Sequence, residues 1–110
     1  MTIETSPRFE RELKALKSRY HSVKKDYKDF LDSLHKNPLQ GASLGKGVRK
    51  VRMAITDKGK GKSGGARVLT YTALVAEEEG KLLLLTIYDK SERSTMTNKE
   101  IKALMKQCGI

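Results

Sequence analysis

The sequence is poor in the residues that most often build disulfides, metal sites and stacking surfaces. Its 110 residues include one cysteine, two histidines and no tryptophan, and aromatic residues make up 5% of the chain. The lone cysteine, Cys108, excludes an internal disulfide, and a free thiol is typical of a reducing compartment. His21 and His35 have no further ligand at metal-binding spacing, so both are expected to be solvated, and neither a metal nor a cofactor is predicted.

Long hydrophobic runs are also missing. The longest apolar stretch covers residues 82–85 and Ile87, far short of a membrane span. Charged residues such as Glu4, Arg8 and Glu10 interrupt the N-terminal region, which argues against a secretory signal segment. The sequence therefore predicts a soluble, cytoplasmic protein with no membrane partner.

The usual catalytic constellations cannot be identified either. There is no serine–histidine–aspartate set and no pair of carboxylates at acid–base spacing, so an enzyme built from this chain must rely on lysine, arginine, tyrosine or an isolated carboxylate. No aromatic pair of the kind found in RNA-recognition motifs is present, which argues against base stacking of that type.

Basic residues, by contrast, are abundant. The chain has 23 lysines and arginines against 13 aspartates and glutamates, a formal net charge of +10. This excess favours an anionic partner, which could be nucleic acid, an acidic protein or a membrane surface. Residues 46–67 hold eight basic side chains against Asp57 alone, so 22 residues carry +7 of the net charge. A solvated surface that serves only solubility is the alternative interpretation.

The hydrophobic pattern predicts one α+β domain over residues 1–110. Residues 2–5 form a short strand or a disordered end. Ser6 and Pro7 are typical of a helix start, and the helix is expected to reach Ser18. A second helix is predicted from a cap at Ser22 to the Asn37-Pro38 pair, and the two helices are expected to be antiparallel. Glycines at 41, 45 and 47 then indicate a flexible approach.

The second half of the chain predicts a small antiparallel sheet and one more helix. Strands are expected at residues 48–55, 67–75 and 81–88, with a turn at residues 77–80. In the first of these strands, residues 51, 53 and 55 form the buried face and residues 50, 52 and 54 the exposed face. The third is apolar on both faces, so it should be well covered. Thr97 and Glu100 match a capping box that opens a C-terminal helix, with residues 101, 104 and 105 turned inward.

The glycine–lysine loop at residues 57–65, DKGKGKSGG, supports three interpretations. A nucleotide-binding P-loop is disfavoured, because Thr56 stands where that motif needs a glycine and a strand, not a helix, follows the loop. A solvated turn is the second interpretation. The third is a loop that tracks phosphates, in which glycines let backbone amides approach and lysines supply charge. Basic residues on both flanking strands favour the third, since a hairpin would place Lys50 and Arg52 near Arg67.

Three segments resemble a known family. VRKVRMA, KGKGKSGGARVLTY and LLLLTIYDKSE are similar to the toxin subunit of type II toxin–antitoxin modules of the RelE/ParE superfamily, and most similar to its HigB-like branch. The resemblance covers nearly the whole chain and implies a microbial-ribonuclease-like sheet with two N-terminal helices. It further implies cleavage of mRNA on the translating ribosome, which inhibits translation, and a cognate antitoxin that is often a helix-turn-helix DNA-binding protein.

The resemblance also implies roles for individual residues. Lys50 and Arg52 match paired basic residues of the family, Arg67 its catalytic arginine, and Lys90 a basic position at the end of the last strand. Ser91 stands where the prototype has a further arginine, for which Arg93 is the substitute. The matched or substitute catalytic positions are Arg67, Lys50, Arg52, Lys90 and Tyr88, with Tyr71 as the other candidate tyrosine; the expected RNA contacts are Lys58, Lys60, Lys62, Arg49 and Arg93.

Two other functions remain open from the sequence. The ParE-like branch of the same superfamily poisons DNA gyrase by protein contact and has no nuclease activity. A non-catalytic RNA-binding domain is the second alternative. The concentration of basic residues on a loop and its two flanking strands favours the nuclease over the gyrase poison.

Overall fold

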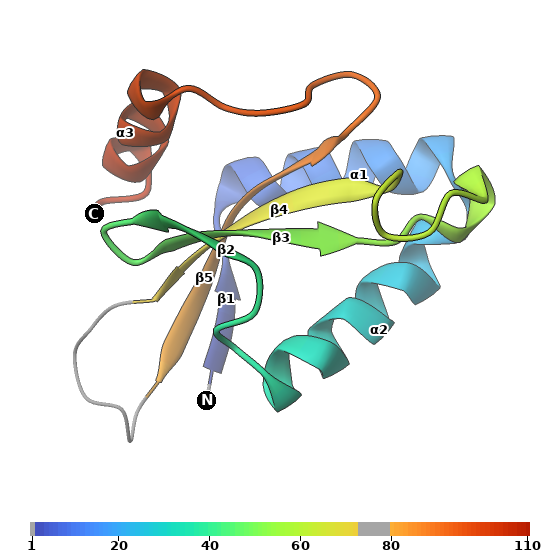
Figure 1. Ribbon diagram of the computed structural model, residues 1–110, viewed down its shortest axis with the longest axis horizontal. Helices are drawn as coiled ribbons and strands as arrows, with labels where there is room; N and C mark the ends of the chain where they lie inside the picture. Colours follow the sequence, from blue (N-terminus) through green and yellow to red (C-terminus); the bar gives the residue numbers. More distant parts are fainter. Residues whose placement is uncertain (1, 73–79) are drawn as a thin grey trace.

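The computed structural model describes residues 2–72 and 80–110. Along the chain, the strands, helices and one 3₁₀ turn (η1) are β1 (Thr2–Thr5), α1 (Pro7–Arg19), α2 (Val23–Lys36), β2 (Ala42–Gly45), β3 (Val48–Met53), η1 (Thr56–Lys58), β4 (Ala66–Thr72), β5 (Lys81–Asp89) and α3 (Asn98–Gln107). The predicted α+β class is confirmed (Figure 1). The predicted turn at residues 77–80 and the end of the predicted strand at 73–75 lie outside the described residues, apart from Gly80.

The sheet has five strands in the order β1-β5-β4-β3-β2. Neighbours β2 to β5 pair antiparallel, as predicted, but β1 pairs parallel with β5, from Thr2 opposite Lys81 to Thr5 opposite Leu84. The predicted antiparallel sheet is therefore confirmed for β2 to β5, and the parallel pairing of β1 is an addition that the sequence pattern did not predict. β1 has only four residues, which is too short a pattern to indicate the direction of its pairing. Its position depends on β5, which lies almost 80 residues away in the sequence.

The segment before β3 is a strand rather than a flexible approach. Its residues Ala42 and Ser43 pair with Lys50 and Arg49, and the chain reverses at residues 45–47. All three residues of this turn have positive φ, 87° at Gly45, 54° at Lys46 and 82° at Gly47. Glycine tolerates this backbone, so the glycines that suggested flexibility instead build a tight hairpin.

Both predicted N-terminal helices are present, and one of their two predicted caps is confirmed. The Ser6 hydroxyl accepts a hydrogen bond from the amide of Phe9 at 3.0 Å. Ser22 makes no such cap. Its hydroxyl donates to the Asp26 carboxylate and accepts from the Asp57 amide, so it links the start of α2 to η1. Asp26 itself is buried and accepts from the backbone and the hydroxyl of Thr56.

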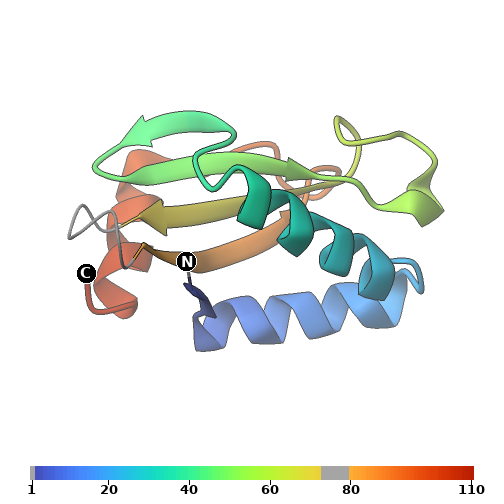
Figure 2. The ribbon, with the colours of Figure 1, turned by 90° about the horizontal axis from the view of Figure 1, so that it is seen from below.

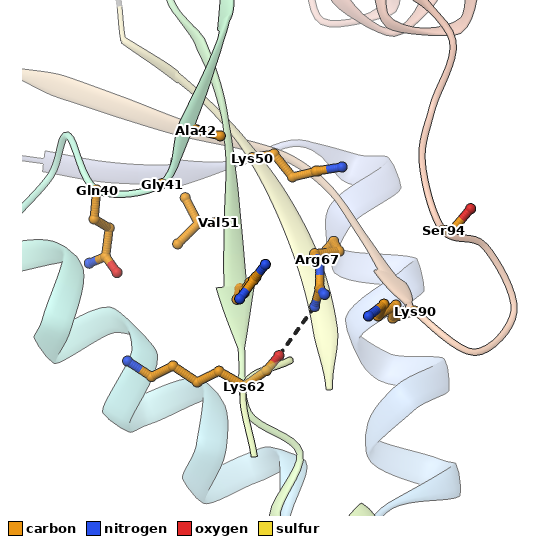
Figure 3. Close-up of a pocket in the computed structure, with 10 residues that line it drawn as sticks. Gln40, Gly41, Ala42, Lys50, Val51, Lys62, Arg67, Lys90 and Ser94 are labelled. Carbon is orange, nitrogen blue, oxygen red and sulfur yellow. Dashed lines mark hydrogen bonds between the residues drawn. The ribbon is translucent and has the colours of Figure 1, made fainter. Parts of the chain in front are cut away.

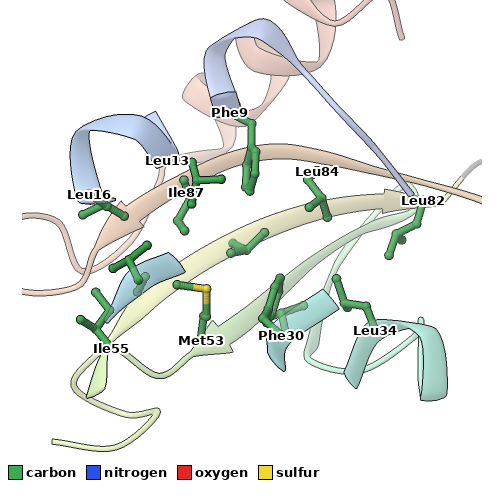
Figure 4. Close-up of a cluster of buried hydrophobic side chains, with 14 residues drawn as sticks. Phe9, Leu13, Leu16, Phe30, Leu34, Met53, Ile55, Leu82, Leu84 and Ile87 are labelled. Carbon is green, nitrogen blue, oxygen red and sulfur yellow. The ribbon is translucent and has the colours of Figure 1, made fainter. Parts of the chain in front are cut away.

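Two hydrophobic clusters cover the two faces of the sheet. α1 and α2 lie on one face (Figure 2), where Phe9, Leu13 and Leu34 pack against residues of the central strands (Figure 4). α3 covers one end of the other face through Ile101 and Leu104. The predicted capping box of α3 is confirmed. β5 contributes to both clusters, as its two apolar faces predicted.

The helices of the described residues have 13, 14 and 10 residues and are too short to cross a membrane.

The uncovered half of the second face is where the basic strand residues emerge. Side chains alternate along β3, so Val51 and Met53 enter the α1/α2 cluster while Lys50 and Arg52 point to the opposite side. The core on one face thereby fixes which side chains the other face exposes.

Gly65 joins the glycine–lysine loop to this sheet through a close backbone contact. A Cβ at residue 65 would lie 2.1 Å from the Met53 carbonyl oxygen and 2.9 Å from the Ile55 nitrogen. The space that a side chain would occupy at Gly65 is filled by the end of β3. The absent side chain is what lets the loop pack against the strand.

Gly65→Ala is expected to lower the free energy of unfolding by about 2–3 kcal/mol, because the new Cβ meets rigid backbone. Gly61→Ala is the control: its φ of +63° strains an alanine, but its Cβ would lie in open space, so a loss of about 1 kcal/mol is expected. Chemical denaturation of both variants measures the difference. A loss at Gly65 no larger than that at Gly61 contradicts the contact.

Candidate functional site

A groove of about 550 Å³ lies on the basic side of the sheet (Figure 3). Its lining comes from β2, β3, β4, the glycine–lysine loop and the segment after β5, and it consists of Gln40, Gly41, Ala42, Lys50, Val51, Arg52, Lys62, Arg67, Lys90 and Ser94. Five of these ten residues are basic and none is acidic. We call it the basic groove. Such a groove attracts phosphates through Coulomb energy and counterion release.

Strand register brings the basic residues together. Arg52 of β3 stands directly opposite Arg67 of β4, and Lys50 stands opposite Leu69 two positions along. Lys90 follows the last residue of β5, and its amide donates to the Gly65 carbonyl oxygen at 3.1 Å. The predicted convergence of Lys50 and Arg52 on Arg67 is therefore confirmed.

Arg67 has two sets of neighbours. It is 4% exposed, and its guanidinium donates to the backbone oxygens of Lys62 at 3.2 Å, Ser63 at 2.9 Å and Ala66 at 3.2 Å. An arginine has five N–H donors, so these three bonds leave two donors without an acceptor among the described residues. Burial, followed by the charge of Arg52, lowers the pKa of Arg67. An anion between the two guanidiniums would relieve this repulsion.

Five predicted site residues lie outside the groove, namely Arg49, Arg93, Tyr88, Lys58 and Lys60. The Arg49 side chain points to the opposite face of β3 from those of Lys50 and Arg52, and its guanidinium donates to the Gly41 carbonyl oxygen. Arg93 forms an ion pair with Glu100. Strand alternation and a local acidic partner explain why neither joins the other basic residues.

Tyr88 lies opposite Arg67 in the sheet but belongs to the cluster under α3. It is 9% exposed, and its hydroxyl is buried without a hydrogen-bond partner among the described residues. Burial raises the pKa of Tyr88, although the charges of Arg67 and Arg93 act in the opposite direction. The structure therefore places the Tyr88 hydroxyl in the cluster under α3 and not in the lining of the basic groove.

The three loop lysines have three different environments. Lys62 lines the basic groove, and Lys60 is exposed beside Lys90 and Ser91. Lys58 belongs to η1, and its ammonium lies 2.5 Å from a carboxylate oxygen of Asp89. Lys58, one of the expected RNA contacts, is therefore held in an ion pair with a buried carboxylate.

Asp89 joins three parts of the chain. It is 1% exposed and accepts hydrogen bonds from Lys58, from the Tyr20 hydroxyl at 3.0 Å, and from the amide and hydroxyl of Ser91. Burial opposes its ionised form, but these donors outweigh burial and hold the pKa of Asp89 well below its usual value. The carboxylate fixes the glycine–lysine loop to the end of β5.

Sequence reasoning missed Asp89 and Gln40 as parts of this region. The only signal for Asp89 was a single acid that ends an apolar strand, and Gln40 stands in the NPLQG segment without a chemical hint of its own. The two histidines are exposed, as predicted. Across residues 2–72 and 80–110, no three histidine, cysteine or acidic side chains gather as a metal site would require.

Lys58→Ala is expected to lower the free energy of unfolding by about 3 kcal/mol, because it leaves the buried Asp89 carboxylate without its cation. Lys60→Ala, an equal truncation on the same loop, is expected to change it by less than about 0.5 kcal/mol. Denaturant titrations at pH 7 compare the two. Equal effects would show that the ion pair contributes no stability of its own.

The pH dependence of the stability lost in Lys58→Ala tests whether the ion pair with Asp89 is the cause of that loss. Because the pKa of Asp89 is depressed in the folded state, its stabilisation is complete above the unfolded pKa near 3.8 and is lost as the pH falls below that value. The difference between wild type and Lys58→Ala should therefore shrink between about pH 4 and pH 2.

The comparison with known families now adds to this geometry. The sequence model of the family described as "RelE toxin of RelE / RelB toxin-antitoxin system" matches residues 9–109. The match spans α1 to α3 and every residue of the basic groove. The predicted resemblance to RelE-type toxins is thereby confirmed, and the family implies a cognate antitoxin as partner. The chain belongs to the RelE family and is a RelE-type toxin of a toxin–antitoxin system.

Proposed function

We propose that this toxin is an endoribonuclease of the HigB-like branch that cleaves mRNA on the ribosome, in the cytoplasm, and so inhibits translation. The observation that carries the proposal is the basic groove, in which five basic side chains and no carboxylate line one hollow. A phosphodiester backbone is the ligand whose charge matches such a lining.

The chemistry that fits this groove is attack of the RNA on itself. The 2′-oxygen forms a bond to phosphorus, the bond from phosphorus to the 5′-oxygen breaks, and a proton moves from the 2′-hydroxyl to the leaving oxygen through a base and an acid. Negative charge grows on the phosphate oxygens in the transition state. Arg52, Arg67, Lys50 and Lys90 surround the groove and can stabilise that charge.

The lining also favours a substrate that something else holds in place. No aromatic side chain lines the basic groove, so the toxin offers no platform there on which bases could stack. An mRNA codon held by the ribosome would arrive already oriented, and orientation is a large part of the barrier to an in-line reaction. This separates the proposal from a general RNA-binding domain.

The ParE-like alternative has less support. A toxin that poisons gyrase through protein contact does not need two guanidiniums facing each other across a strand pair, an arrangement that is unfavourable without an anion. The antitoxin, a helix-turn-helix DNA-binding protein, neutralises the toxin by laying an acidic segment over the basic groove, since opposite charges promote association.

The cleavage experiment uses two arginines of one strand. Arg52→Ala is expected to slow single-turnover cleavage of ribosome-bound mRNA by about a hundredfold or more, because it removes a donor to the developing charge. Arg49→Ala removes the same side chain from the other face of β3 and should stay within about threefold of wild type. Rapid-quench assays on purified, folded toxins measure both rates.

The same assay can refute the proposal. If Arg49→Ala and Arg52→Ala lose activity equally, the basic groove does not hold the scissile phosphate. If the wild-type toxin leaves mRNA intact on the ribosome and in free solution, the nuclease function itself is wrong.

Variants of Arg67 test whether its guanidinium, which also binds the backbone of the glycine–lysine loop, takes part in the cleavage reaction. Arg67→Ala should lose about a hundredfold or more in cleavage rate, and Arg67→Lys should recover only part of it, because lysine cannot present the planar fork of donors. Thermal unfolding of both variants gives the structural share of the loss. Cleavage by Arg67→Ala at the wild-type rate would remove the guanidinium from the mechanism.

A further inference from the structure

A second cavity, of about 280 Å³, opens beside the basic groove. It lies between α2, the end of β3 and the glycine–lysine loop, and its lining consists of Asp26, Asp29, Phe30, Ser33, Arg52, Met53, Ala54, Thr56 and Lys62. Arg52 and Lys62 line both hollows, so the two are contiguous. Figure 3 shows the Lys62 side chain extending from the loop toward α2.

The second cavity differs from the basic groove in chemistry. Its lining includes the buried side chains Phe30 and Met53 together with two carboxylates. One of them, Asp26, already accepts hydrogen bonds from Ser22 and from both donors of Thr56. Asp29 is exposed on the next turn of α2, and no hydrogen bond or ion pair within the described residues engages its carboxylate.

Gln40 adds a second acceptor where the two hollows meet. Its side-chain nitrogen donates to the Asn37 carbonyl oxygen at 3.1 Å and to the Ser33 hydroxyl at 3.2 Å. Because a backbone carbonyl only accepts, these bonds fix the amide with its nitrogen toward the end of α2. The amide oxygen is left as the acceptor that Gln40 can offer to a ligand.

We propose that this second cavity is a base-recognition subsite, in which Asp29 reads the exocyclic amino group of a nucleotide whose phosphate lies in the basic groove. The inference rests on the proposed function. A carboxylate repels phosphate, so a carboxylate beside a phosphate groove suits a different part of the nucleotide. Among the bases, cytosine, adenine and guanine each present an exocyclic amino donor to a carboxylate acceptor, whereas uracil has none and presents a carbonyl oxygen where cytosine has its amino group.

The apolar part of the lining fits the same ligand. A base has two weakly hydrated faces and a polar edge, so it matches a cavity that is lined by Phe30 and Met53 and by carboxylate acceptors. Arg52 and Lys62, at the boundary, would bind the phosphate that connects this base to the next nucleotide. Asp29 thus acts on specificity, not on the chemical step.

The experiment compares cytosine with uracil, which differ chiefly at the position that Asp29 would read. Fluorescently labelled 2′-O-methyl pentanucleotides of each base, which cannot be cleaved through a 2′-hydroxyl, are titrated with free toxin at fixed ionic strength. Wild-type toxin is expected to bind the cytosine oligonucleotide about tenfold more tightly than the uracil one, as a hydrogen bond to a charged acceptor predicts.

Asp29→Asn should bring the two affinities within about twofold of each other, and any gain in affinity from the lost negative charge should be the same for both oligonucleotides. The matched control is Asp32→Asn, because Asp32 is exposed on the same helix and lines neither hollow. Its cytosine preference should equal that of wild type.

Three results would overturn the subsite: no cytosine preference in wild type, a preference that survives Asp29→Asn, or an equal loss for both oligonucleotides. Binding to these oligonucleotides does not depend on cleavage. A cytosine preference in a toxin that fails to cut mRNA would refute the nuclease function and leave the subsite standing. Normal cleavage of mRNA without a cytosine preference would refute the subsite and leave the nuclease function standing.

Discussion

The pairing of β3 with β4 is the constraint on which the site depends. Register places Arg52 opposite Arg67, and two guanidiniums in that position repel each other. The arrangement persists because Val51, Met53 and Val68, on the other face of the same strands, are buried under α1 and α2. A slip of one residue would send the basic side chains into the core and the apolar ones to solvent. Burial on one face thus enforces the concentration of charge on the other.

The glycine–lysine loop is held to this sheet at its two ends by different forces. Near its start, Lys58 is paired with the buried Asp89, and near its end, Gly65 packs against the backbone of β3. Between them, Arg67 binds the backbone oxygens of Lys62 and Ser63. The loop is therefore a positioned part of the groove wall. The Arg67 guanidinium both binds the backbone of this wall and contributes positive charge to the groove. A substitution of Arg67 is therefore expected to affect both stability and cleavage.

The sequence predicted the features that depend on local pattern. Alternation in β3 gave the exposed face of Lys50 and Arg52, and the capping box gave the start of α3. What it could not provide depends on distant partners. The parallel pairing of β1 rests on a strand at the other end of the chain, and the commitment of Lys58 rests on Asp89, 31 residues away. A lysine in a glycine-rich stretch looks the same whether it faces solvent or a buried carboxylate. The basic groove was predictable because strand pairing follows from the hairpin, but the cavity beside α2 was not.

The most direct test of the account is whether the 2′-oxygen of the substrate performs the cleavage. The measurement is single-turnover reaction of the toxin with ribosome-bound mRNA that carries one 2′-deoxynucleotide at the mapped cut site, with the unmodified mRNA as control. The account predicts that the unmodified strand yields a 2′,3′-cyclic phosphate and a 5′-hydroxyl, and that the deoxy strand binds equally well but stays uncut at that position. Cleavage of the deoxy strand at the control rate would contradict it, as would products that carry a 5′-phosphate.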